Sequence, residues 1–171
     1  MLPAAYSAQE HLRDGRPVKV RALHPDDKAG MLAAIDRAST ESLKRRFFVT
    51  KRGFSEKEKA FFMDIDFANH VALVVEIDES GETAIIGGGR YVVVKSGHAE
   101  MAFLIVDAYQ GQGIGAILAR HLVGLARAAG LKQVSADILP ENVAMLRVLG
   151  KFGFRTSGRD PQVVHLTLPL V

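Results

Sequence analysis

Apolar and polar residues follow two patterns along this chain, one typical of β-strands and one typical of helices. Short apolar stretches bounded by Gly, Pro, Asp or Ser predict strands, and apolar residues spaced three or four apart predict helices. The predicted strands cover residues 17–23, 71–77, 83–94, 99–106, 132–138, 154–157 and 163–168. The predicted helices begin at His24, Ser39 and Ser55 and also cover residues 114–129 and 141–152.

The order of these elements predicts the fold class. Three consecutive strands joined by short turns predict an antiparallel meander, and the helix between residues 106 and 132 predicts one βαβ crossover. We therefore expect a single α+β (mixed α/β) domain over residues 17–171, with a largely antiparallel central sheet and helices on both faces. Residues 1–16 have weak periodicity, and we expect them to form a loose N-terminal lead-in.

Composition and charge narrow the function classes. The chain has 171 residues, of which 48% are hydrophobic and 24% charged, as in an ordinary globular domain. A net charge of +3 is too small to argue for nucleic acid as a partner. The absence of cysteine excludes a disulfide scaffold, a thiolate metal site and a cysteine nucleophile. The sequence has no long apolar span and no signal-peptide core, so we expect a cytoplasmic protein without a membrane partner. We expect the protein to be a monomer or a homodimer.

A glycine-rich turn, residues 110–115 (QGQGIG), lies between a predicted strand and a predicted helix. The free N–H groups and the positive dipole end of a helix N-terminus attract anions such as a pyrophosphate, and Gly111, Gly113 and Gly115 leave room for one. The spacing does not fit a dinucleotide fingerprint, and no Lys follows as in a P-loop. From these six residues alone, an anion site and a plain structural turn remain equal alternatives.

Several stretches resemble the GNAT acetyltransferases. The turn matches their coenzyme A signature, Q/R-x-x-G-x-G/A, and Asn142 followed by an apolar run and Gly153-Phe154 matches a second family feature. Residues 39–48 (STESLKRRFF) and 99–103 (AEMAF) are similar to segments of the Pat-type protein lysine acetyltransferases. The resemblance implies a GNAT fold from Pro17 to the C-terminus, with acetyl-CoA as co-substrate and no metal.

The resemblance also implies roles for particular residues. The general base would be Glu100, and the backbone of the following strand would pair with the pantetheine arm of the coenzyme. Asn142 would contact the pantetheine, although from the residues alone Glu100 could be a solvated strand end and Asn142 an ordinary helix cap. The implied coenzyme contacts are Phe103, Leu104, Ile105, Gln110, Gly111, Gln112, Gly113, Ile114, Gly115, Ala116 and Asn142.

One position departs from the wider family. Many GNAT enzymes carry a tyrosine seven residues after the asparagine, where it protonates the coenzyme thiolate, and this chain has Leu149 there. A thiol has a pKa of about 8.5, so a thiolate is a tolerable leaving group near neutral pH and the missing tyrosine does not exclude catalysis. The six histidines show no metal-ligand spacing.

We therefore expect an acetyl-CoA-dependent N-acetyltransferase that passes the acetyl group directly to a primary amine. A lysine side chain has a pKa of about 10.4 and must lose a proton before it attacks a thioester, which is the task of a general base. The Pat-type resemblance implies a protein lysine as the preferred acceptor. A small-molecule amine acetyltransferase and a non-catalytic acyl-CoA-binding module remain alternatives.

Overall fold

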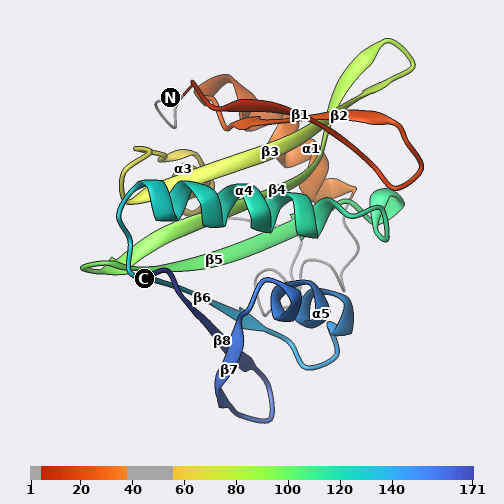
Figure 1. Ribbon diagram of the computed structural model, residues 1–171. Helices are drawn as coiled ribbons and strands as arrows, with labels where there is room; N and C mark the ends of the chain where they lie inside the picture. Colours follow the sequence, from red (N-terminus) through yellow and green to blue (C-terminus); the bar gives the residue numbers. More distant parts are fainter. Residues whose placement is uncertain (1–4, 38–55) are drawn as a thin grey trace.

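A computed structural model describes residues 5–37 and 56–171 as one eight-stranded sheet with helices packed on it (Figure 1). The strand order is β1-β2-β3-β4-β5-β6-β8-β7, and every neighbouring pair is antiparallel except β5 and β6. The strands are β1 (Ser7–His11), β2 (Pro17–Ala22), β3 (His70–Glu79), β4 (Glu82–Lys95), β5 (His98–Ile105), β6 (Gln133–Ile138), β7 (Arg155–Arg159) and β8 (Val164–Pro169). The predicted mixed, largely antiparallel sheet with one crossover is confirmed.

Helices cover both faces of the sheet, as predicted. The described helices are α1 (Lys28–Asp36), α3 (Glu56–Met63), α4 (Ile114–Ala128) and α5 (Val143–Lys151), with short 3-10 turns at Pro25–Asp27 and Asp107–Tyr109. Helix α4 crosses the face shown in front in Figure 1, and α1 lies behind the sheet. The predicted helix over residues 39–48 lies outside the described residues, as does Ser55.

The glycines of β4 explain how closely α4 approaches the sheet. A Cβ atom on Gly87 would lie 3.0 Å from Ile114, and one on Gly89 would lie 3.0 Å from Leu122. A Cβ on Gly88 would instead face Met31 of α1, at 4.0 Å, because successive residues of a strand point to opposite faces. These glycines therefore allow α4 to pack against the sheet over a core that includes the fully buried Leu118 and Leu122.

The parallel pair at the centre of the sheet is short. Only His98–Met101 of β5 pair with Gln133–Ala136 of β6, although β5 continues to Ile105 and β6 to Ile138. The two strands diverge beyond Met101, as the separation of β5 and β6 in Figure 1 shows. Residues 102–105 keep their ladder with β4 and have no ladder with β6, so one edge of β5 is open.

The expectation of a loose lead-in over residues 1–16 is wrong for residues 7–11. These residues form β1, which pairs antiparallel with β2 from Ser7↔Arg21 to His11↔Pro17. An edge strand with a mostly polar sequence gives little hydrophobic periodicity, since it is held chiefly by backbone hydrogen bonds to its single neighbour. The sheet therefore begins ten residues earlier than the first predicted strand, at Ser7 instead of Pro17.

Candidate active site

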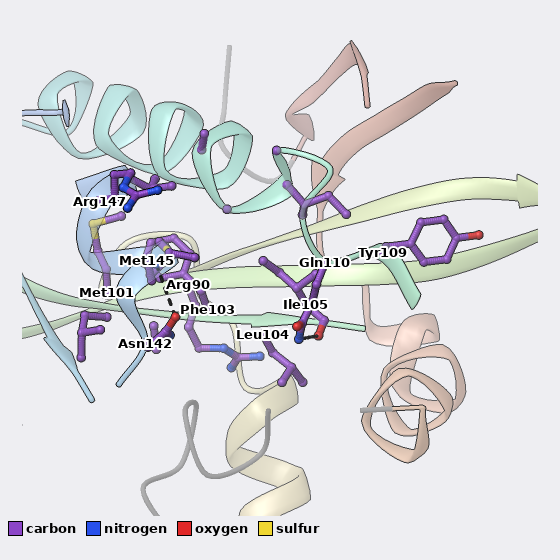
Figure 2. A pocket seen from close by; sticks show the side chains of 18 of the residues that line it. Arg90, Met101, Phe103, Leu104, Ile105, Tyr109, Gln110, Asn142, Met145 and Arg147 are labelled. Atoms are coloured by element: carbon purple, nitrogen blue, oxygen red, sulfur yellow. Dashed lines mark hydrogen bonds between the residues drawn. The ribbon is translucent and has the colours of Figure 1, made fainter. Parts of the chain in front are cut away.

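A cavity of about 570 Å³ opens where β5 and β6 diverge, between the N-terminal end of α4 and helix α5. Its size lies within the usual range for ligand sites. The cavity brings together eleven of the twelve residues predicted from the sequence: Glu100, Phe103, Leu104, Ile105, Gln110, Gly111, Gly113, Ile114, Gly115, Ala116 and Asn142. Figure 2 shows part of this lining, with α4 on one side of β5 and Arg90 and Leu104 on the other.

Gln112 is the predicted residue that does not line the cavity. Its side-chain oxygen accepts a hydrogen bond from the backbone N–H of Asp14 at 3.2 Å, and its carbonyl accepts one from the N–H of Arg13 at 3.1 Å. Gln112 therefore joins the glycine turn to the β1–β2 hairpin. The prediction of a coenzyme contact did not anticipate this role, because the hairpin was not expected.

The glycine turn has the geometry of an anion site. Gly111 and Gly113 have φ values of +81° and +90°, a region that residues with a Cβ rarely adopt. Gly113 is the N-cap of α4 and brings no side chain to cap it. The N–H groups of Ile114, Gly115 and Ala116 therefore have no partner within the helix, and they lie at the positive end of its dipole.

The open edge of β5 and the turn meet at one end of the cavity. Gln110 donates from its side-chain amide to the carbonyl of Ile105 at 3.5 Å, so the first residue of the motif reaches back to the end of β5 (Figure 2). Backbone groups of Phe103, Leu104 and Ile105 on the β6 side have no strand partner. An extended chain bearing amides, such as pantetheine, fits this edge because it can supply the missing hydrogen bonds.

Glu100 lies near the point where β5 and β6 separate. It sits opposite Val92 of β4 and Ser135 of β6, and its side chain is exposed at the cavity wall. Alternation along β5 places Glu100 on the same face as Ala102 and Leu104, the face away from α4.

Arg90 is a buried cation on that same face, and the sequence analysis missed it. Its Nη1 donates to the carbonyl of Phe62 at 3.0 Å and to Nε2 of His70 at 2.9 Å. Burial, and secondarily the charge of Arg90, lowers the pKa of His70 to about 4, so the ring is neutral at pH 7 and can accept this bond. Phe61 stacks on the ring of His70, with 5.0 Å between ring centroids. These residues fix the guanidinium in the cavity wall.

Asn142 is a helix cap and also part of the cavity lining. It is the N-cap of α5, and its Oδ1 accepts a hydrogen bond from the N–H of Met145 at 3.3 Å (Figure 2). The same side chain lines the cavity. Leu149, at the usual position of the family tyrosine, is completely buried and does not line the cavity.

Several charged residues of the cavity were not among the predicted site residues. Arg13 comes from the supposed lead-in, and Arg147 and Lys151 come from α5. Asp137 of β6 also lines the cavity, and its Oδ1 lies 2.5 Å from Nδ1 of His165 on β8. That hydrogen bond raises the pKa of His165. Only the fold brings these side chains to one cavity, since they lie on three separate segments, the β1–β2 turn, β6 and α5.

The described residues contain neither a metal cluster nor a membrane-crossing helix. Within residues 5–37 and 56–171, no three His, Asp or Glu side chains gather in a way that could hold a metal ion. In the same ranges, no helix is both long and apolar enough to cross a membrane.

Residues 31–154 match the Acetyltransferase (GNAT) family, and the chain belongs to this family. It is 35% identical over 161 residues to an acetyltransferase of Pseudomonas aeruginosa, which covers 91% of this chain and 86% of the relative. It is 30% identical over 146 residues to the acetyltransferase Pat of Mycolicibacterium smegmatis. That alignment covers 83% of this chain and 42% of Pat, so the chain spans less than half of Pat.

The fold agrees with the sequence relationship. The crystal structure of the GNAT domain of S. lividans PAT superposes with a TM-score of 0.86 and 30% sequence identity, covering 95% of this chain and 96% of that domain. The resemblance to Pat-type enzymes is therefore confirmed. The chain is an N-acetyltransferase. Acetyl-CoA is the acetyl donor that this family uses.

Proposed function

We propose that this enzyme acetylates lysine side chains of proteins, with Glu100 as the general base and with coenzyme A held along β5 and the glycine turn. The observation that carries the proposal is the place of Glu100. Its carboxylate lies near the divergence of β5 and β6 and lines the same cavity as Gly111 and Gly113. A base is needed beside the acyl group, and the open edge of β5 leads from the turn to Glu100.

The chemistry follows from these positions. Glu100 accepts a proton from the lysine ammonium, and the neutral amine forms a C–N bond to the acetyl carbonyl carbon. The C–S bond breaks, and the coenzyme leaves as a thiolate. The second N–H proton of the attacking nitrogen is lost as the amide forms and protonates this thiolate, and the proton on Glu100 is released to water. Amide, thiol and one released proton therefore balance the reaction. A backbone N–H on the open edge of β5 can donate to the carbonyl oxygen as it becomes negative, a contribution typically worth ~3 kcal/mol.

The charges of the cavity favour a lysine over a polycationic metabolite. The described lining contains two carboxylates, Glu100 and Asp137, against four cations, Arg13, Arg90, Arg147 and Lys151. A polyamine would meet a net positive wall and would be repelled. A single lysine extended from a folded protein needs only one narrow entrance and one base. This supports a protein acceptor, as does the resemblance of the sequence to protein lysine acetyltransferases.

The test is to follow labelled acetyl groups in a lysate of the source cells. The lysate is separated by filtration into proteins and small molecules, and each fraction is incubated with labelled acetyl-CoA and pure enzyme. We expect label on a few discrete proteins, resistant to hydroxylamine as an amide is and a thioester is not. Label confined to small amines would contradict the proposal and would favour the small-molecule alternative.

A further inference from the structure

Strand β1 of the β1–β2 hairpin is held against α4 by side-chain hydrogen bonds. Glu10 of β1 receives two hydrogen bonds from the guanidinium of Arg120, at 2.9 and 3.1 Å, and its Oε2 lies 2.7 Å from Nε2 of His121. His121 is buried, and its other ring nitrogen bonds the hydroxyl of Tyr6. This network joins the hairpin to the helix whose N-terminus carries the glycine turn.

The turn of the hairpin is fixed to the glycine turn itself. The backbone N–H groups of Arg13 and Asp14 both donate to Gln112, at 3.1 and 3.2 Å. Nη1 of Arg13 donates to the carbonyl of Gly111 at 3.2 Å. Figure 1 shows the hairpin reaching the segment that precedes α4. The hairpin therefore holds the backbone of Arg13 in a set position beside the turn.

The guanidinium of Arg13 stands out from its neighbours because it forms no ion pair with any described residue. Asp14, the adjacent acid, is occupied by Arg16, with Nε at 2.9 Å and Nη2 at 2.8 Å. Arg120 is likewise paired with Glu10. Arg13 instead lines the cavity, and a Cβ on Gly113 would lie 3.9 Å from its Nε. An arginine has five N–H donors in a rigid fork, and one of them is occupied by Gly111.

We propose that Arg13 is a coenzyme-binding residue that contacts a phosphate of coenzyme A, so that the N-terminal hairpin is part of the coenzyme site. This inference rests on the proposed function and adds a residue to its coenzyme site. It does not depend on which amine is acetylated. Arginine binds phosphate oxygens through charge-assisted, often bidentate hydrogen bonds. At this place it adds a full positive charge to an anion site that otherwise consists of backbone N–H groups and a helix dipole.

Two phosphate groups could be the target, the pyrophosphate and the 3′-phosphate on the ribose. Direct titration calorimetry with coenzyme A, with dephospho-coenzyme A and with pantetheine separates them without any acceptor amine. The variant is Arg13→Met, which removes the guanidinium with its charge and its bond to Gly111 but keeps an unbranched apolar stem and the backbone bond to Gln112. The charge-matched control is Arg155→Met, since Arg155 is exposed on β7, at the opposite end of the sheet from β1.

We expect Arg13→Met to raise the Kd for coenzyme A roughly tenfold, as for loss of a partly exposed charge-assisted contact. Arg13→Lys should recover part of the affinity, and the Kd for pantetheine should not change in any variant. If dephospho-coenzyme A shows the same loss, the pyrophosphate is the target, and if it shows none, the target is the 3′-phosphate. The wild-type affinity should also weaken with added salt more steeply than that of Arg13→Met.

An unchanged Kd for coenzyme A in Arg13→Met would overturn the proposal. So would an equal loss for pantetheine, because it would show that Arg13 only supports the shape of the turn. These outcomes are independent of the acceptor experiment, which tests the protein-lysine proposal with the wild-type enzyme.

Discussion

At the scale of single residues, one wall of the cavity carries an exposed carboxylate, Glu100, and a buried guanidinium, Arg90. Glu100 on β5 and Arg90 on β4 share a face of the sheet, since Arg90 is opposite Ala102 and Glu100 is opposite Val92. Arg90 is held by the carbonyl of Phe62 and by the neutral ring of His70, so its charge stays in the wall. A positive charge in the wall beside Glu100, the proposed base, favours an incoming amine that has lost its proton over an ammonium ion.

Replacing Glu100 by Gln should separate catalysis from coenzyme binding. We expect turnover to fall by ~100- to 10,000-fold, the usual contribution of a general base, while the Kd for acetyl-CoA stays nearly constant. The rate of the wild-type enzyme should rise toward alkaline pH, and the variant should lose this dependence. Label transfer at several pH values and calorimetry measure the two effects.

Glu82→Gln provides the matched control, since Glu82 is exposed at the start of β4 and lies outside the cavity. It should behave as the wild type in both measurements. If Glu100→Gln keeps most of its activity at neutral pH, Glu100 is a structural residue and the base lies elsewhere.

At the scale of elements, helix α4 serves both the core and the site. Its buried face packs on the glycines of β4, and its N-terminus presents free N–H groups next to Gly113. No acidic residue lies in its first turn, although an acid there would stabilise the helix through the dipole. This is consistent with a first turn that faces an anionic ligand.

An acidic residue in the first turn of α4 should stabilise the helix and weaken the binding of an anionic ligand. The Ala116→Asp variant tests both effects. Ala116 is half-buried in the first turn of α4 and lines the cavity. We expect the aspartate to stabilise the helix by about 0.3–1 kcal/mol through the dipole while repelling the coenzyme phosphates. The Kd for coenzyme A should therefore rise at least tenfold, which is about 1.4 kcal/mol, without a fall in thermal stability.

The isosteric Ala116→Asn variant isolates the charge in this experiment. It should bind coenzyme A much more tightly than Ala116→Asp, because it has the same shape without the negative charge. Equal affinities of the two variants would show that the phosphates do not lie against the first turn of α4.

The pairing of Glu10 on strand β1 with Arg120 leads to a second prediction at this scale. The hydrogen bonds from Arg120 lower the pKa of Glu10 to about 2, below the 4.5 of an unperturbed glutamate. A carboxylate whose pKa is lower in the folded state stabilises the fold above pH 4.5 and loses this contribution as the pH falls toward 2. We expect Glu10→Gln to cost on the order of 2 kcal/mol at pH 7 and much less near pH 2.

Urea unfolding of the wild type and Glu10→Gln between pH 7 and pH 2 measures this difference. Gln9→Ala is the control, because Gln9 is exposed on the same strand and should change the free energy of unfolding little at any pH. A gap between wild type and Glu10→Gln that stays constant with pH would contradict the assigned pairing.

Strongly amphipathic elements and glycine turns could be predicted from the sequence, and polar edge elements could not. The apolar faces of α4 and α5 and the buried stretches of β3 and β5 carry clear periodicity, and the glycines require special backbone conformations. Strand β1 has no such signal. Its omission also removed Arg13 from the candidate site, which shows how one missed element can hide a residue that lines the cavity.

At the scale of the whole molecule, the site arises from long-range topology that local patterns do not contain. Asp137 and His165 meet because β6 pairs with β8, and Arg90 reaches Glu100's face because β4 pairs with β5. The predicted site residues, in contrast, nearly all lie between residues 100 and 116. The sequence motifs contain the cavity-lining residues that are neighbours in sequence. They do not contain the cavity-lining residues that only the completed sheet brings together.

The divergence of β5 from β6 also affects how the protein avoids self-association. An unpaired strand edge on the outside of a sheet is a template for another chain and a risk for aggregation. Here the edge over residues 102–105 is enclosed between α4 and α5, at a cavity that a thin, extended ligand can enter more easily than a second strand with its side chains. The packing of α5 through Met145 and Leu149 thus shields this edge from other polypeptides while leaving it open to ligand.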